Sequence, residues 1–115
     1  APIDYDTIFQ SIEKTNKVIV LDTGHLNGSI SGEIISRIID HSWDNLSAKP
    51  ERLAMPNFPE GTSYSLTKEY HVDAKDISLK ILEMLSVSID TSAAEVFFKK
   101  EHPHDIPGDW FTGPF

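Results

Sequence analysis

A short apolar segment, Lys17–Leu21, is the feature that most constrains how this chain can fold. After the lysine it runs Val-Ile-Val-Leu without interruption, and most of these side chains are β-branched. Such a run is typical of a strand that is covered on both faces within a parallel sheet. We therefore predict an α/β fold with this strand inside it.

The residues that follow the strand predict a strand-helix-strand unit. Asp22–Gly32 contains three glycines and is interpreted as a loop, and isoleucines at helical spacing then predict an amphipathic helix up to Trp43. Pro50 ends that region, and Leu53–Met55 is predicted to form a short second strand. The crossover between the two strands should be right-handed.

Amphipathic helices are predicted on both sides of this unit. Asp4 can cap a helix that ends near Thr15, and Asp73 can cap another that continues to Leu85. The stretch 57–72 between the second strand and the later helix is expected to be irregular. Only two convincing strands emerge, whereas small sheets generally need three or more strands or extensive helix cover. Other polypeptide should therefore complete the sheet.

The chain changes character after Ser86. Ser92 and Glu95 have the spacing of a capping box and predict one short helix, after which the chain is rich in proline, glycine and aromatic residues. We accordingly divide the chain into a domain at residues 1–86 and a C-terminal extension at residues 87–115. The aromatic residues of the extension are Trp110, Phe111 and Phe115. We expect this arm to pack on a neighbouring subunit or on the missing half of its own chain, and a flexible end is the alternative.

Composition excludes several functions. The formal net charge of −8 would repel nucleic acid and anionic lipid, so we expect neither as a partner. The sequence lacks an apolar run of the roughly 20 residues that span a bilayer. Cysteine is absent, which removes disulfides, thiolate metal sites and a cysteine nucleophile. We expect a cytoplasmic protein, or one of the mitochondrial matrix in a eukaryote.

The glycine loop is the first place to look for a binding site. A strand that leads through glycines into a helix often places anions at the helix N-terminus. Gly24, Gly28 and Gly32 do not have dinucleotide-binding spacing, however, and no phosphate-loop lysine follows. The structural interpretation is that they allow tight turning and close helix packing. His25 in this loop could act as a catalytic base or lie in an interface.

Several segments together resemble the C-terminal domain of transketolase-type enzymes, most closely that of the beta subunits of 2-oxoacid dehydrogenases. The matching segments are 2–8, 15–22, 28–34, 52–59 and 70–85. Gly28, Gly32 and Glu33 fit the family's helix entry, whereas serines replace glycines at positions 29 and 31. The resemblance implies a three-layer α/β/α sandwich around a mainly parallel sheet, from which this chain lacks the first βαβ portion.

The resemblance also implies a function for the parent protein. Such enzymes use thiamin diphosphate and Mg²⁺ to decarboxylate a 2-oxoacid and transfer the acyl group, and these cofactors are bound by other domains. This domain is then an assembly piece without catalytic residues, and its partners are the remainder of the enzyme and its homo- or hetero-oligomer subunits. The family position of Gly24, His25, Gly28, Gly32 and Glu33 favours a subunit interface. A stand-alone binding module that uses Gly24–Gly32 for an anion or a partner chain is the alternative.

Two features affect further partner and metal predictions. Family members can dock an acyltransferase's subunit-binding domain through an acidic residue, but Ser47 stands near that position here. His102 and His104 could bind a metal, yet Pro103 pushes their rings apart and no strong third ligand is nearby. We therefore predict no metal site in this chain.

Overall fold

The computed structural model describes residues 2–88, 90–99, 106 and 109–113. Its elements along the chain are α1 (Tyr5–Thr15), β1 (Ile19–His25), α2 (Ile30–Ser42), a 3₁₀ turn η1 (Trp43–Asn45), β2 (Glu51–Met55), α3 (Tyr64–Thr67), α4 (Ala74–Met84) and α5 (Thr91–Phe97). The strands β1 and β2 pair in parallel, with Leu21 opposite Leu53. The predicted α/β class and the strand-helix-strand unit are confirmed.

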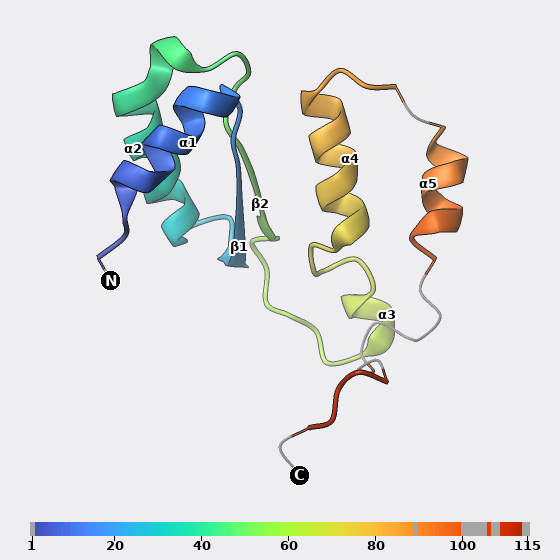
Figure 1. Cartoon of the computed structure of the whole chain (residues 1–115). Helices are drawn as coiled ribbons and strands as arrows, with labels where there is room; N and C mark the ends of the chain where they lie inside the picture. The colour runs from blue at the N-terminus through green and yellow to red at the C-terminus, as the bar shows by residue number, and fades with distance from the viewer. Residues whose placement is uncertain (1, 89, 100–105, 107–108, 114–115) are drawn as a thin grey trace.

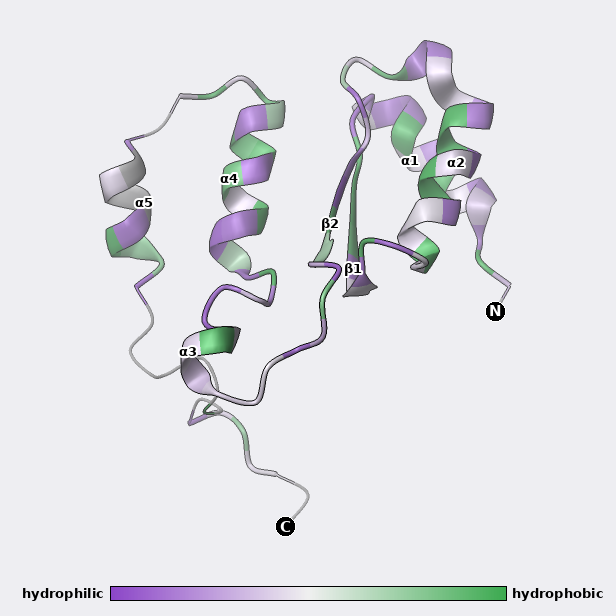
Figure 2. Ribbon diagram, turned by 180° about the vertical axis from the view of Figure 1, so that it is seen from behind, coloured by the Kyte–Doolittle hydropathy of each residue, from purple (hydrophilic) through white to green (hydrophobic). Residues whose placement is uncertain are grey.

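The helices are arranged in layers about the two strands. Figure 1 shows α1 and α2 on one face of the sheet and α4 on the other, with α5 beyond α4. The reverse view in Figure 2 shows the same order of layers and hydrophobic colouring along much of β1. This is the α/β/α order that the sequence predicts, with two described strands in the sheet.

The first helix is joined closely to the second. Asp4 caps α1 by accepting a hydrogen bond from the Thr7 backbone N–H at 3.0 Å. The Phe9 ring stacks on the His41 ring of α2, with parallel planes and centroids 3.9 Å apart. Between these helices and the sheet lie the most deeply buried apolar side chains of this half, Ile12 at 2% exposure and Ile38 at 0%. The core of this half is small.

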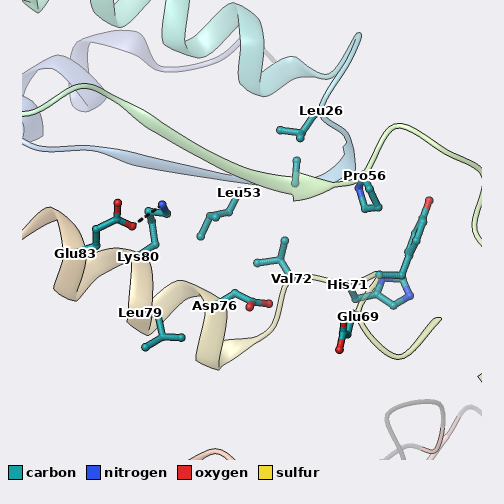
Figure 3. A pocket seen from close by; sticks show the side chains of 12 residues that line it. Leu26, Leu53, Pro56, Glu69, His71, Val72, Asp76, Leu79, Lys80 and Glu83 are labelled. Atoms are coloured by element: carbon teal, nitrogen blue, oxygen red, sulfur yellow. Dashed lines mark hydrogen bonds and ion pairs between the residues drawn. The ribbon is translucent and has the colours of Figure 1, made fainter. Parts of the chain in front are cut away.

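The strand β1 differs from its prediction in extent and in cover. It continues to His25, so Asp22–His25 is strand and not loop, and α2 begins at Ile30, before Gly32. The prediction of full cover is wrong for Leu21, whose side chain is 52% exposed. Its partner Leu53 lies on the face towards α4 (Figure 3), and paired residues share a face, so Leu21 points to that side as well.

The cover on that side is partial because α4 lies beside β2. The space between them, about 480 Å³, is lined by Leu53 and Ala54 of β2 and by Leu79, Lys80 and Glu83 of α4 (Figure 3). Every sheet residue that lines this space belongs to β2. The part of this sheet face that β1 contributes is apolar, and α4 does not cover it.

Two segments in the second half also depart from expectation. The stretch 57–72, expected to be irregular, contains the single helical turn α3. Helix α5 begins at Thr91, so Ser92 lies inside it and the predicted capping box does not form there. Instead, the Asp90 side chain accepts hydrogen bonds from the Ser92 backbone N–H at 2.9 Å and from its hydroxyl at 2.6 Å. Asp is as good a cap as Ser, so sequence spacing alone did not place the helix start.

Helix α4 begins with a capping box whose loss should be measurable. Asp73 accepts from the Lys75 and Asp76 backbone N–H groups, and the Asp76 side chain accepts from the Asp73 N–H. We expect Asp73→Ala to lower the free energy of unfolding by about 1 kcal/mol, because two backbone donors lose their acceptor. Urea denaturation followed by circular dichroism would measure this. Glu13→Ala, an exposed change within α1, is the control, and an equal loss in both variants would contradict the capping role.

Candidate functional site at the carboxyl end of the sheet

The carboxyl ends of the two parallel strands lie at the same edge of the sheet. There His25 is opposite Met55, and the Leu26 backbone N–H donates to the Met55 carbonyl at 2.9 Å. The loop to α2 and the loop to α3 both leave from this edge (Figure 1). In open α/β sheets this is the edge at which ligands and partners most often bind.

Asp22 occupies the position at which an external anion would be expected. Its carboxylate accepts from the Gly24 N–H at 2.8 Å and from the Ser31 N–H, in the first turn of α2, at 3.0 Å. These hydrogen bonds, that of Gly24 first, hold the pKa of Asp22 below its usual value. The Asp22 carboxylate therefore already binds the N-terminus of α2, where an external anion would otherwise bind. This geometry argues against an anionic ligand in the Gly24–Gly32 loop.

The lowered pKa of Asp22 makes a pH-dependent contribution to stability. A carboxyl whose folded pKa lies below its unfolded value of about 3.9 stabilises the fold above that pH, and the contribution disappears as pH falls through the folded pKa. We expect Asp22→Asn to lower the melting temperature at pH 7 by about 4 °C. The difference from the wild type should shrink as pH falls below about 4.

Thermal melts at a series of pH values, recorded by circular dichroism, would check this expectation. Asp40→Asn removes one negative charge from an exposed position of α2 and controls for net charge. A difference between wild type and Asp22→Asn that stays constant down to pH 2 would contradict the role of the ionised carboxylate.

The glycines of the loop serve the backbone and its packing. Gly28 has φ of +76°, a left-handed conformation that favours glycine. At Gly32 a side chain would bring its Cβ to 3.2 Å from Nη1 of Arg52. Arg52 reaches across from β2 and donates from Nη1 to the Leu26 carbonyl at 3.1 Å. The contacts favour the structural interpretation of these glycines, and they assign Arg52 a role that the sequence did not suggest.

His25 and Tyr70 connect the strand end to the loop after β2. His25 Nδ1 lies 2.7 Å from the Pro56 carbonyl oxygen, which can only accept, so Nδ1 carries the proton. The Tyr70 hydroxyl donates to the Phe58 carbonyl at 2.8 Å. Burial, followed by the charge of Glu60, raises the pKa of Tyr70, so its phenol remains a neutral donor. Tyr70 is 3% exposed and anchors this loop.

A shallow hollow of about 360 Å³ opens beside His25. It is lined by His25, Asn27, Asn57, Phe58 and Pro59. The other lining residues carry no acidic or basic side chain, so the hollow offers His25 no partner for acid-base catalysis. Among the described residues, no group of three or more His, Cys, Asp or Glu side chains could hold a metal ion. The interface role of His25 stays a prediction.

The structure gathers some of the predicted site residues and separates others. Gly24, His25, Gly28 and Gly32 surround the end of β1 and the start of α2. Glu33 follows on the exposed side of α2, where it pairs with Arg37 at 3.1 Å.

The predicted aromatic residues lie elsewhere in the chain. Trp110 and Phe111 are 80% and 51% exposed, and Phe115 lies outside the described residues, as do His102 and His104.

Sequence reasoning missed Asp22, Arg52, Asn57 and Tyr70 as members of this site. Asp22 stood at the end of a predicted strand beside a predicted helix start, which is a usable signal for a carboxylate cap. The other three carry no local signal, because their partners are distant in sequence: the Asn27 N–H donates to Asn57 Oδ1 from 30 residues away. Their positions depend on how the two loops meet.

The described residues include no helix long and apolar enough to cross a membrane.

Comparisons with known proteins agree with the fold. The family model described as the transketolase C-terminal domain matches residues 1–77. A pyruvate dehydrogenase E1 component subunit beta from Mesostigma viride is 33% identical over 85 residues, which cover 74% of this chain and 26% of that protein. The beta subunit of an acetoin:2,6-dichlorophenolindophenol oxidoreductase from Bacillus subtilis is 34% identical over 85 residues, covering 74% of this chain and 25% of that protein.

The chain thus spans about a quarter of the length of these relatives. The matched region contains β1, α2 and β2, the elements that carry the candidate site. The resemblance first noted in short segments is confirmed by a match that covers most of the chain. This chain belongs to the transketolase C-terminal domain family.

Proposed function

We propose that this chain is a subunit-assembly domain of a thiamin-diphosphate-dependent enzyme, either a 2-oxoacid dehydrogenase that decarboxylates and transfers an acyl group or a transketolase-like enzyme. The family match and the beta subunits among its relatives support this proposal. Thiamin diphosphate and Mg²⁺ would be bound by other parts of that enzyme, because the described residues here offer no metal cluster and the α2 N-terminus is already occupied by Asp22.

The observation that carries the assembly role is the open half of the sheet. Leu21 is 52% exposed although it lies in the most apolar strand, next to Leu53 on the face that α4 covers only in part. An exposed leucine inside a sheet leaves apolar area in water that a neighbour could bury. The proposal is that the rest of the parent enzyme covers this face.

A charge on this face should separate the chain from its assembly. Native mass spectrometry of the tagged chain, purified from cells that make it, should show it bound to polypeptide that carries thiamin diphosphate. Leu21→Asp should release it, because a buried unpaired carboxylate is strongly unfavourable. Ser36→Asp places the same charge on the exposed side of α2 and should leave the complex intact. Retention of Leu21→Asp, or purification without a thiamin diphosphate protein, would contradict the proposal.

Calorimetric titration separates this proposal from a stand-alone binding module. Neither thiamin diphosphate with Mg²⁺ nor nucleotides should give saturable heat with the 115-residue chain. Saturable binding of a nucleotide would favour the binding module, and binding of thiamin diphosphate would place the cofactor site in this chain.

A further inference from the structure

The hollow beside His25 has a definite pattern of hydrogen-bonding groups. Because His25 Nδ1 donates to the Pro56 carbonyl, Nε2 of the neutral ring carries a lone pair and can only accept. Because Asn57 Oδ1 accepts from the Asn27 N–H at 2.7 Å, its amide nitrogen is the remaining donor. Among the described residues, no hydrogen bond reaches His25 Nε2 or the Asn57 amide nitrogen.

The apolar part of the hollow consists of Phe58 and Pro59. Phe58 is 55% exposed, and its ring is held edge-on against the buried Tyr70 ring, with centroids 5.4 Å apart. No Asp, Glu, Lys or Arg side chain lines the hollow. An occupant that fits is therefore uncharged, has a flat apolar group to lie against Phe58, and carries an N–H donor for His25 Nε2.

The same chain carries such a group in its C-terminal arm. Trp110 is 80% exposed, and its indole N–H can only donate. Its ring lies edge-on to Phe111, with centroids 6.0 Å apart, and no hydrogen bond to its indole N–H occurs within the part of the chain that the structure describes. Large exposed aromatics of this kind commonly anchor protein interfaces. The acceptor site and the donor thus occur, separately exposed, on one polypeptide.

We propose that the arm of one copy of this chain docks in the hollow of a second copy. The Trp110 indole N–H donates to His25 Nε2, and the ring lies against Phe58. A pair of copies related by a two-fold axis makes this contact twice, so the weak gain of one contact is doubled. This inference rests on the proposed assembly function and names one of its contacts.

The net charge of the chain gives the contact a characteristic salt dependence. Each copy carries a formal charge of −8, and like charges oppose association. The docking contact itself is uncharged, so added salt screens the repulsion without weakening the contact. Self-association should therefore tighten between low and high salt.

Trp110 fluorescence provides a direct test. The sequence contains two tryptophans, so Trp43→Phe leaves Trp110 as the only one. In this background the emission should shift to shorter wavelength as the concentration of the full chain rises, and sedimentation velocity should show a dimer over the same range. Trp110→Phe, tested by sedimentation in the wild-type chain, should weaken the dimer about tenfold, because His25 Nε2 loses its donor.

A matched pair of His25 variants tests the acceptor without removing the fold. His25→Asn keeps a donor near the Nδ1 position for Pro56 and lacks a group at the Nε2 position, so the fluorescence shift and the dimer should be lost. His25→Gln places an amide at the Nε2 position and should retain dimerisation in part. Asn57→Asp keeps the acceptor for the Asn27 N–H, adds a charge to the hollow, and should weaken the dimer. Circular dichroism would verify that all three are folded.

Three results would overturn the inference. Solvent-like Trp110 emission at every concentration would mean that the arm does not dock. A blue shift that is independent of concentration would mean that the arm occupies a site on its own copy. Equal dimerisation of His25→Asn and wild type would mean that the hollow is not the site. Leu21→Asp is measured by loss of the thiamin diphosphate protein, whereas the His25 variants are measured by self-association of the chain, so each proposal can fail without the other.

Discussion

Replacing Ile38 with alanine is expected to lower the free energy of unfolding by about 3 kcal/mol. The Ile38 side chain is 0% exposed on the inner side of α2, against the sheet and α1. Among the described residues only Ile12, Ile38 and Tyr70 are buried apolar side chains. A core this small offers few neighbours that could shift to fill the cavity. The variant should therefore lose the free energy of burying the removed atoms and also bear the free-energy cost of the unfilled cavity.

The adjacent residue supplies the control. Ile39 is on the same helix and is 37% exposed, so Ile39→Ala removes the same atoms with a smaller loss of buried area, expected to cost about 1 kcal/mol. Urea denaturation at constant pH would measure both variants. Equal losses would show that α2 does not use Ile38 as its inward residue.

The second large effect is expected at Tyr70. Tyr70→Ala should lower the melting temperature by about 10 °C, because it removes a ring that is 3% exposed and the hydroxyl that donates to the Phe58 carbonyl at 2.8 Å. The ring also lies edge-on to His25, Phe58 and His71. Its loss should loosen the loop after β2 together with the end of β1.

Tyr70→Phe separates the ring from the hydroxyl. It retains the packing and leaves the Phe58 carbonyl without this donor, so the melting temperature should fall by only about 4 °C. Hydrogen exchange would locate the effect: in Tyr70→Ala, backbone amides of residues 25–27 and 57–58 should exchange faster than in Tyr70→Phe. Unchanged exchange in these loops would contradict the anchoring role.

Much of the fold follows from patterns that are local in the sequence. Asp4 and Asp73 cap helices where the sequence predicts them, because a cap and its N–H partners lie within one helical turn. The isoleucines of α2 predict its inward face for the same reason. The family likeness is also read from sequence, since it depends on the order and spacing of short segments.

Other features depend on where distant segments meet. The first strand runs on through Asp22–His25 because the β2 backbone lies beside it, which its glycine-containing sequence does not reveal. The open face at Leu21 exists because α4 lies beside β2, and an apolar run looks the same whether one face or both are covered.

The sequence by itself determined α1, α2 and α4, the presence of the two strands, the α/β class and the family of this chain. Only the tertiary structure decided that β1 extends to His25, that Leu21 is open to solvent, and that His25 faces Pro56 and Tyr70, which are 31 and 45 residues away along the chain. The physical reason is the separation along the chain over which each kind of interaction acts. Periodicity and capping act within a turn or two of backbone, whereas cover and side-chain partners depend on the path of the whole chain.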